Sequence, residues 1–186
     1  MKFFSALTLT AALLSSQFVQ AIEVSGVQIA DKITLQEQPL TLNGAGIRSK
    51  FFMDLYVGSL YVPTHMKTTA EVIDAPIAAI RLNITSGLIT SEKMHDAIIE
   101  GFEAATADNT TDIQSQIDAF MALFKDEIKL GDQFTFVASK AQGVTAYKNG
   151  QEQATIEGEM FRQALLKIWL GEKPAQKSLK EAMLGK

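Results

Sequence analysis

The residues of this chain best suited to bind an anion lie in the apolar stretch Leu42–Pro63, LNGAGIRSKFFMDLYVGSLYVP. Within it stand one arginine, Arg48, one aspartate, Asp54, and, two residues later, Tyr56. A guanidinium makes a bidentate, charge-assisted hydrogen bond to a carboxylate, and a phenol can add a further donor. Two plainer interpretations stay open: Arg48 in a surface salt bridge at a turn, and Tyr56 as a core aromatic residue with a satisfied hydroxyl.

Two strands joined by a turn would have to position these side chains. The glycines, the charges and the closing proline favour buried strands over a membrane segment. We expect the turn at Arg48–Lys50, because the whole run is too long for one straight strand. In the second strand, one apolar face would meet core helices and the other would line a cavity. The first face comprises Phe51, Met53, Leu55 and Val57, and the second Phe52, Asp54, Tyr56 and Gly58.

The expected turn limits how Arg48 and Tyr56 could act together. With Arg48 at the tip and Tyr56 about six residues along the sheet, a rise of about 3.3 Å per residue separates their backbones by roughly 20 Å. Both could reach one carboxylate only if the sheet bends. Gly44 and Gly46 are the positions at which we expect such a bend.

The composition argues against several other kinds of site. The chain has no cysteine, which removes thiol catalysis, thiolate metal ligands and disulfides. His65 and His95 stand thirty residues apart without paired carboxylates, so we predict no metal site. Gly44-Ala45-Gly46 lacks the following helix that a phosphate-binding loop needs. The net charge of −4 disfavours nucleic-acid binding. We expect no cofactor.

Residues 1–21 have the pattern of a secretory signal peptide. Lys2 precedes an apolar core from Phe3 to Leu14, and Val19-Gln20-Ala21 has small residues at the two key cleavage positions. The apolar core is shorter than the roughly 20 residues that a bilayer span requires. We therefore predict an exported protein, periplasmic or secreted, with one domain at residues 22–186 and no transmembrane segment in the mature chain. The sequence predicts no particular oligomeric state.

The remaining elements predict the fold class. A strand pattern covers Ile77–Thr85, and helices follow caps at Thr90 or Ser91 and at Thr111 or Asp112. Two further strands flank Asn149-Gly150, the strongest short hairpin signal. A helix over Gly158–Leu170 and a short one over Leu179–Leu184 complete the chain. This order predicts an α+β fold, with a large, mostly antiparallel sheet covered on one side by a layer of α-helices.

The sequence resembles the chalcone isomerase-like family, in particular its bacterial exported members. The resemblance lies in four passages, GAGIRSKFFMDLYVGSLYV, SGLITSEKMHDAIIEGF, FKDEIKLGDQFTFVAS and QALLKIWLGEKP, and covers nearly the whole mature chain. It implies an open-faced β-sandwich with a ligand cleft between the sheet and the helices. The founding members of that family are plant enzymes that close a flavanone ring from a chalcone, whereas other members bind fatty acids and are not enzymes.

The resemblance also assigns roles to individual residues. The catalytic arginine of the plant enzymes falls on Arg48, and their strand threonine falls on Tyr56. In the fatty-acid-binding members this position resembles a tyrosine, which with the arginine holds the carboxylate. The enzymes' catalytic tyrosine falls on Thr90, their asparagine on Ala97, and their serine or threonine on Ile168. Thr90 keeps a hydroxyl but not an acidic phenol, and Ala97 donates nothing.

The resemblance thus implies a non-catalytic protein that binds a fatty acid or similar hydrophobic carboxylate, with Arg48 as the anion anchor and Tyr56 as the second donor. Two alternatives stay open. One is an isomerase or intramolecular lyase that uses Arg48 and Thr90. The other is a structural cell-envelope protein whose vestigial cleft is filled by side chains.

Overall fold

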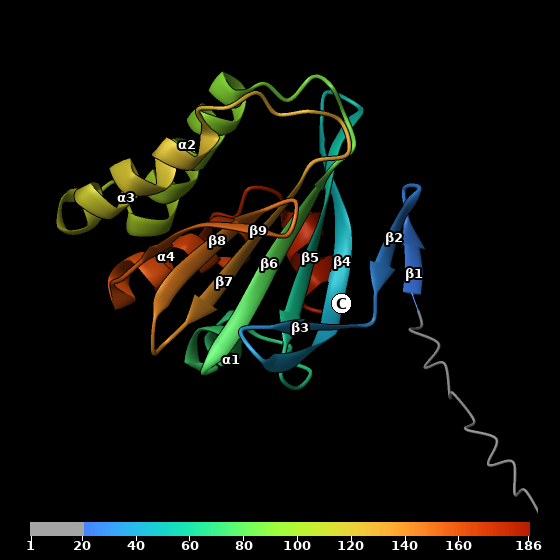
Figure 1. Cartoon of the computed structure of the whole chain (residues 1–186), viewed down its shortest axis with the longest axis horizontal. Helices are drawn as coiled ribbons and strands as arrows, with labels where there is room; N and C mark the ends of the chain where they lie inside the picture. The colour runs from blue at the N-terminus through green and yellow to red at the C-terminus, as the bar shows by residue number, and fades with distance from the viewer. Residues whose placement is uncertain (1–20) are drawn as a thin grey trace, which may run out of the picture.

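The computed structural model describes residues 21–186, which fold around one large antiparallel sheet. Seven strands, β3 to β9, follow one another across this sheet in chain order, and β1 and β2 form a separate hairpin beside it (Figure 1). The strands are β1 (Ala21–Val24), β2 (Val27–Ala30), β3 (Lys32–Leu35), β4 (Gln38–Lys50), β5 (Met53–Val62), β6 (Ile77–Ile84), β7 (Gln133–Ser139), β8 (Gly143–Lys148) and β9 (Gln151–Ile156).

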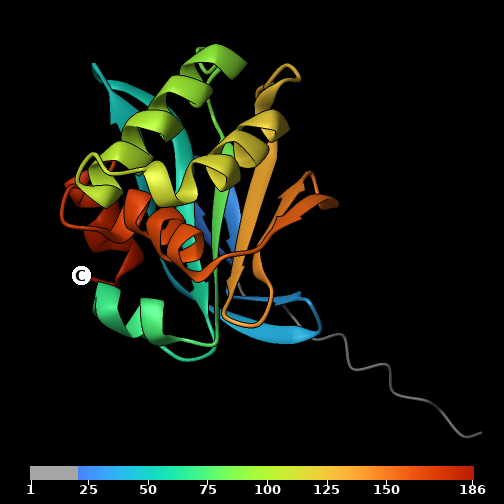
Figure 2. The ribbon, with the colours of Figure 1, turned by 90° about the vertical axis from the view of Figure 1, so that its left-hand side faces the viewer.

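Five α-helices lie on one face of the sheet (Figure 2). They are α1 (Thr69–Asp74), α2 (Ser91–Thr106), α3 (Gln114–Met121), α4 (Glu159–Leu170) and α5 (Lys177–Met183), with 3₁₀ turns at Thr111–Ile113 and Ala122–Phe124. None of the helices within residues 21–186 combines the length and the apolar character that crossing a bilayer takes. The predicted α+β fold with helices on one side of the sheet is confirmed. The predicted signal peptide lies outside the described residues, apart from Ala21, which begins β1.

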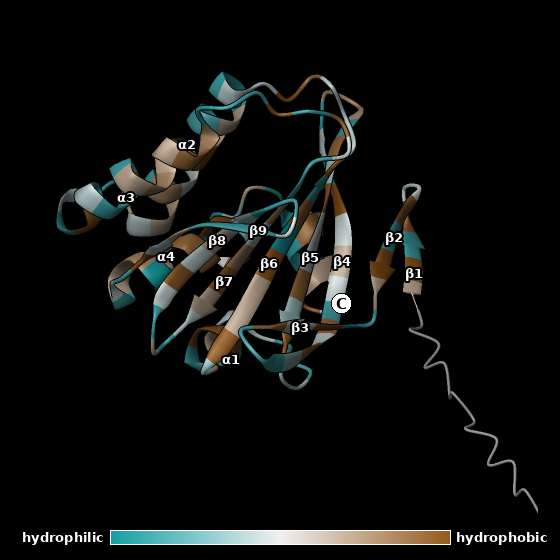
Figure 3. Ribbon diagram, in the orientation of Figure 1, coloured by the Kyte–Doolittle hydropathy of each residue, from teal (hydrophilic) through white to brown (hydrophobic). Residues whose placement is uncertain are grey.

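The main core fills the space between the sheet and the helices. Phe102 of α2 stacks on Phe161 of α4 with ring centroids 5.4 Å apart, and Phe120 of α3 contacts both rings. Figure 3 shows hydrophobic residues along β6 and β7, two of the strands that cover this core. Because stacked and edge-on aromatic pairs stabilise beyond their buried area, this cluster fixes how α2 and α4 lie relative to each other.

A second, smaller core covers the other face of the sheet, where the β1–β2 hairpin packs. Val57 and Tyr61 of β5 belong to it together with Ile29 of β2, whereas Tyr56 and Leu60 point toward the helices. The predicted assignment of faces is therefore wrong for Val57, which faces the hairpin. It is also wrong for Asp54, whose carboxylate accepts hydrogen bonds from Ser25 of the β1–β2 turn and from Ser49.

The turn of the opening hairpin also differs from the prediction. Strand β4 continues to Lys50, which pairs with Met53, so the turn residues are Phe51 and Phe52 rather than Arg48–Lys50. Phe51 and Phe52 have φ angles of 50° and 66°. Bulky residues seldom occupy this left-handed region, so their sequence gave no turn signal. The Asn149-Gly150 turn between β8 and β9 is confirmed.

The glycines of the opening stretch make room for α5. A Cβ on Gly44 would overlap the backbone carbonyl of Ala182, and one on Gly58 would stand 2.6 Å from the Met183 side chain. Asn43, an extra residue in β4, also holds α5 against the sheet. Its side-chain amide donates to the carbonyls of Met66 and Met183 at 2.8 Å each, and Met183 is the last residue of α5. These glycines therefore permit the close packing of α5 against the sheet.

Helix α4 is held by a buried arginine. Arg162 is fully buried and donates from Nε and Nη2 to Glu159 at 2.7 Å each, and from Nη2 to the carbonyl of Ile73, at the end of α1, at 2.8 Å. The Arg162 hydrogen bond lowers the pKa of Glu159 from 4.5 to about 2, outweighing the effect of partial burial. Through its bond to Ile73, Arg162 joins α4, which carries part of the candidate site, to α1.

Replacing Gly44 by alanine should destabilise the protein by about 1–3 kcal/mol, because the added methyl group forces α5 away from β4. Urea denaturation measures this loss. Gly87→Ala is the matched control, since a Cβ there meets no atom within 4 Å and should change stability by less than about 0.5 kcal/mol. Equal urea midpoints for the two variants would contradict the close packing of α5.

The Glu159–Arg162 pair predicts a specific acid sensitivity. Because the pKa of Glu159 is lower in the folded state, its contribution is complete above pH 4.5 and is lost as the pH falls toward 2. In Glu159→Gln this component is absent, so the urea midpoint should fall less steeply between pH 4.5 and 2 than in the wild type. Parallel decreases in the two proteins would show that the pair does not contribute.

Candidate ligand-binding cleft

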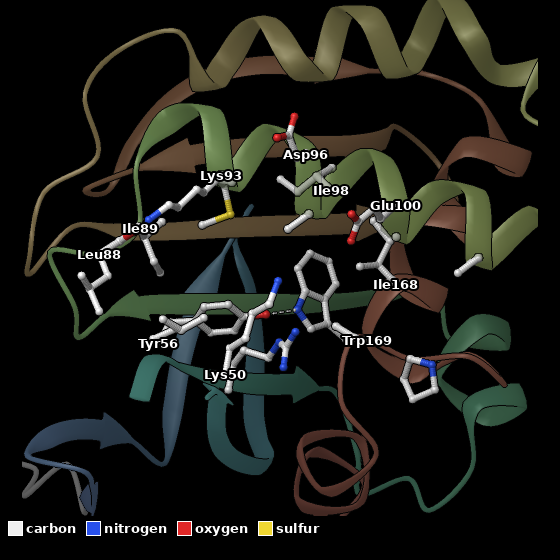
Figure 4. Close-up of a pocket in the computed structure, with 18 of the residues that line it drawn as sticks. Lys50, Tyr56, Leu88, Ile89, Lys93, Asp96, Ile98, Glu100, Ile168 and Trp169 are labelled. Carbon is white, nitrogen blue, oxygen red and sulfur yellow. Dashed lines mark hydrogen bonds between the residues drawn. The ribbon is translucent and has the colours of Figure 1, made fainter. Parts of the chain in front are cut away.

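A cleft of about 690 Å³ opens between the β4–β5 end of the sheet, helix α2 and the chain around the end of α4 (Figure 4). Its volume lies within the roughly 300–1,000 Å³ that is typical of small-molecule sites. Arg48 and Tyr56 both line it. A vestigial cleft filled by side chains would not leave this space open.

Arg48 and Tyr56 are direct neighbours on adjacent strands. They are paired residues in the β4–β5 ladder, so the predicted separation of roughly 20 Å is wrong, and no bend is needed to bring them together. The turn lies at Phe51-Phe52, beyond Lys50, and this leaves Arg48 inside β4. Opposite residues in an antiparallel pair stand about 4.5–5.5 Å apart, within reach of one small anion.

A β-bulge shapes the floor of the cleft beside this pair. The next ladder pair after Arg48–Tyr56 is Ser49–Asp54, so Leu55 is an extra residue in β5. A bulge locally interrupts the alternation of side chains along a strand. Consequently Leu55 and Tyr56, although adjacent in sequence, both line the cleft.

Gln176, which precedes α5, holds the guanidinium of Arg48. Arg48 Nη1 donates to Gln176 Oε1 at 3.0 Å and to the Ser49 carbonyl at 2.8 Å, and Gln176 Oε1 also accepts the Ser49 N–H at 2.9 Å. These two bonds use the donors of Nη1, and the rest of the guanidinium faces the Tyr56 hydroxyl, on which it acts both as a charge and through a side-chain hydrogen bond. The guanidinium is thus fixed through one nitrogen and keeps donors for a ligand. No local pattern in the sequence pointed to Gln176.

Trp169, near the end of α4, fixes the hydroxyl of Tyr56. Its indole Nε1 lies 3.0 Å from the Tyr56 oxygen, and Figure 4 shows the two rings meeting through this bond. An indole N–H can only donate, so the hydroxyl oxygen accepts and the phenolic hydrogen stays available for another acceptor. The apolar stripe of this helix, from Met160 to Trp169, predicts core packing alone. Trp169 does stack on Phe136, but a buried indole also needs an acceptor, which was the overlooked signal.

The hydroxyl of Tyr56 stays protonated. Burial raises the pKa of Tyr56 above its ordinary value of 10.0, and this outweighs the hydrogen bond from Trp169 and the charge of Arg48, which both favour the ionised form. Tyr56 is therefore a neutral hydrogen-bond donor at neutral pH. The ring is in the core and its hydroxyl is bonded to Trp169, as the plainer interpretation predicts, and the residue also lines the cleft.

The walls of the cleft are mainly apolar. Helix α2 contributes Met94, Ala97 and Ile98, and α4 contributes Ile168. Thr90 is placed elsewhere: it caps α2 by accepting the N–H of Lys93 at 3.2 Å and is not among the residues that line the cleft. Of the positions matched to the plant enzymes, Arg48, Tyr56, Ala97 and Ile168 thus meet at the cleft, and Thr90 does not.

Charged side chains stand along the open rim. Lys50 ends β4 and Lys93 lies in the first turn of α2, while Asp96 and Glu100 lie further along α2, about one turn apart. Figure 4 shows Lys50 extending toward the Tyr56–Trp169 pair. With Arg48, these lysines place three cations at the hairpin end of the cleft, whereas Lys173 is the cation that lines it beyond the end of α4, so the hairpin end is the favourable end for an anion.

The Tyr56–Trp169 bond should appear as a coupling between the two side chains. Tyr56→Phe leaves the indole N–H buried without its acceptor, and we expect the free energy of unfolding to fall by about 1–3 kcal/mol. In Trp169→Phe proteins the same tyrosine change should cost about 1 kcal/mol less. Urea denaturation of the four proteins of this cycle measures the difference, and purely additive losses would refute the coupling.

Comparison with known proteins places this geometry in a family. A profile described as chalcone isomerase-like matches residues 21–185. The crystal structure of a fatty-acid binding protein from Arabidopsis thaliana is similar, with a TM-score of 0.67 and 16% sequence identity over 89% of this chain and 96% of that chain. At this identity the likeness concerns the fold alone. No curated protein sequence gives a significant match. Because the profile spans nearly the whole chain, the protein belongs to the chalcone isomerase-like family.

Proposed function

We propose that this protein binds a fatty acid, or a similar hydrophobic carboxylate, in the cleft between sheet and helices, and that it does so without catalysis. One observation carries the proposal: Arg48 and Tyr56 are paired on adjacent strands, and both present free donors to a mainly apolar cleft. The similar Arabidopsis structure is of a fatty-acid binding protein, which supports this choice of ligand.

The head of the ligand would lie at the hairpin end of the cleft. Nε and Nη2 of Arg48 can donate to carboxylate oxygens, and the Tyr56 hydroxyl can donate a third hydrogen bond. Arg48 has no acceptor, and the Tyr56 oxygen already accepts the bond from Trp169. The site therefore suits an ionised carboxylate better than a neutral alcohol or amide.

The tail would lie against the apolar walls. Ile98 and Ile168 face the cleft from α2 and α4, and Leu55 lies on its floor. Each methylene that these walls remove from water contributes about 0.8 kcal/mol, so a long chain would supply most of the affinity. Asp96 and Glu100 on α2 would repel a carboxylate bound in the reverse direction.

Catalysis of the chalcone isomerase type has less support in this geometry. The hydroxyl that the alternative reaction would need, on Thr90, serves as the cap of α2, and the walls at Ala97 and Ile168 offer no polar group. We further propose that residues 1–21 direct export, so that binding takes place in the periplasm or outside the cell. Detection of the mature N-terminus by mass spectrometry would test this part separately.

Arg48→Met should weaken fatty-acid binding about 10–100-fold, because hydrogen bonds to charged groups are worth about 1.5–3 kcal/mol. Native mass spectrometry after lipid exposure detects the adduct, and the rise in melting temperature with added fatty acid measures the affinity. Arg81→Met is the matched control, because Arg81 bonds to Thr135 and packs over Tyr61, away from the cleft. A fatty alcohol of equal chain length is the ligand control.

If the wild-type protein forms no adduct and added fatty acid leaves its melting temperature unchanged, the proposed function is wrong. If Arg48→Met and Arg81→Met bind equally well, the protein binds lipid but Arg48 is not its anchor.

A further inference from the structure

One of the tight turns of this fold has an unusual composition. Four hairpins in residues 21–186 close with two turn residues each, Ser25-Gly26, Gln36-Glu37, Phe51-Phe52 and Asn149-Gly150. All eight turn residues have positive φ. Such turns favour glycine, asparagine and aspartate, because the Cβ of other residues crowds the backbone there. Only the Phe51-Phe52 turn places two large apolar residues in this conformation.

Packing within the protein does not compensate for this choice. Phe52 is 108% exposed and Phe51 is 79% exposed, so neither ring is removed from water. Lys50 Nζ lies over the Phe51 ring, 5.9 Å from its centre. Both backbone preference and hydration therefore disfavour phenylalanine at this turn in the isolated protein. A surface that covers the two rings would remove them from water, which lowers the free energy of the protein.

Other exposed apolar side chains gather at the same end of the sheet. Seven large hydrophobic residues in the described chain are markedly exposed, and five of them form what we call the apolar tip: Phe51, Phe52, Met53, Leu88 and Leu130. Hydrogen bonds from Thr85 to Leu55 and from Gly131 to Ile84 hold their three segments together. In Figure 1 these segments meet at the top of the view, and Figure 3 shows hydrophobic residues there.

The apolar tip forms the mouth of the cleft. Phe51, Met53 and Leu88 line the cleft as well as being exposed. Lys50 and Lys93 stand beside them on the cleft side. Two nearby acidic groups face elsewhere: Asp54 bonds to Ser25 on the other face of the sheet, and Glu92 lines a separate groove between α2 and α3. The Leu130 segment itself carries both signs, with Lys125 and Lys129 beside Asp126 and Glu127. Around Phe51, Met53 and Leu88 the mouth is thus apolar with the basic Lys50 and Lys93 at its edge, although the whole chain is acidic.

We propose that the apolar tip docks on an anionic lipid bilayer, with Phe51 and Phe52 inserted at the level of the headgroups and the mouth of the cleft facing the membrane. Exposed aromatic residues flanked by lysines suit this interface, because the rings enter the apolar boundary while the ammonium groups meet anionic lipids. Resting on the proposed function, the docked state would let a fatty acid pass between bilayer and cleft without crossing water.

The first test reports on the tip itself. Phe52→Trp adds a fluorophore to a chain whose one tryptophan, Trp169, is 2% exposed. Mixed phosphatidylcholine–phosphatidylglycerol vesicles should shift its emission to the blue, and headgroup-level nitroxide lipids should quench it. Glu37→Trp is the matched control, because Glu37 is exposed and holds the same turn position with φ 61°, at the other end of β4. Its emission should not change.

The second test separates docking from folding. Phe52→Gly places glycine at φ 66°, so we expect a higher urea midpoint than in the wild type but about tenfold weaker co-sedimentation with the same vesicles. Wild type and variant share residues 1–21, so any contribution of that segment cancels. High salt and uncharged phosphatidylcholine vesicles should each weaken the wild-type binding.

Three outcomes would overturn docking on lipid. They are no blue shift with Phe52→Trp, equal shifts with Glu37→Trp, and a blue shift without vesicles that grows with protein concentration, which would make a second copy of the chain the partner. Arg48→Met distinguishes this proposal from the proposed function, because it should lose fatty-acid adducts and keep vesicle binding. If wild-type protein binds vesicles but never takes up fatty acid, docking stands and the ligand assignment fails.

Discussion

The pairing of β4 with β5 next to their turn determines what this cleft can bind. In that register Arg48 lies opposite Tyr56, and the bulge at Leu55 directs an apolar side chain to the same floor. A slip by one residue would send the side chains of one strand to the opposite face, toward the β1–β2 hairpin. A charged donor, a neutral donor and an apolar surface are therefore set side by side by backbone hydrogen bonds alone.

The helices then decide how those donors are used. Gly44 and Gly58 let α5 approach the sheet closely, and this brings Gln176, just before α5, against Arg48. Trp169 at the end of α4 does the same for Tyr56. In each case one polar atom of the strand residue is occupied and the remaining donors are left free. Preorganisation of this kind lowers the entropy cost of binding, because the donors need not be ordered by the ligand.

Much of the fold could be predicted from the sequence, because helical spacing, capping residues and the Asn149-Gly150 turn are local signals. The register of the first hairpin could not. Its turn consists of Phe51 and Phe52, which no turn preference indicates, and a bulge leaves no local mark in the sequence. Arg48 and Tyr56 were chosen from the sequence as candidate ligand-binding residues, and both line the cleft. Their partners were missed because hydrogen bonds between residues more than a hundred positions apart have no local sequence pattern.

Those long separations in the chain have a consequence for when the site comes into being. Arg48 and Gln176 are 128 residues apart, and Tyr56 and Trp169 are 113 apart. Synthesis proceeds from the N-terminus, so both strand residues are made long before the groups that orient them. Closing such large loops is also slow relative to local folding. The donors are thus oriented only when the chain segments at the ends of α4 and before α5 are in place, so a ligand that requires oriented donors can be held only by a chain whose final helices have docked.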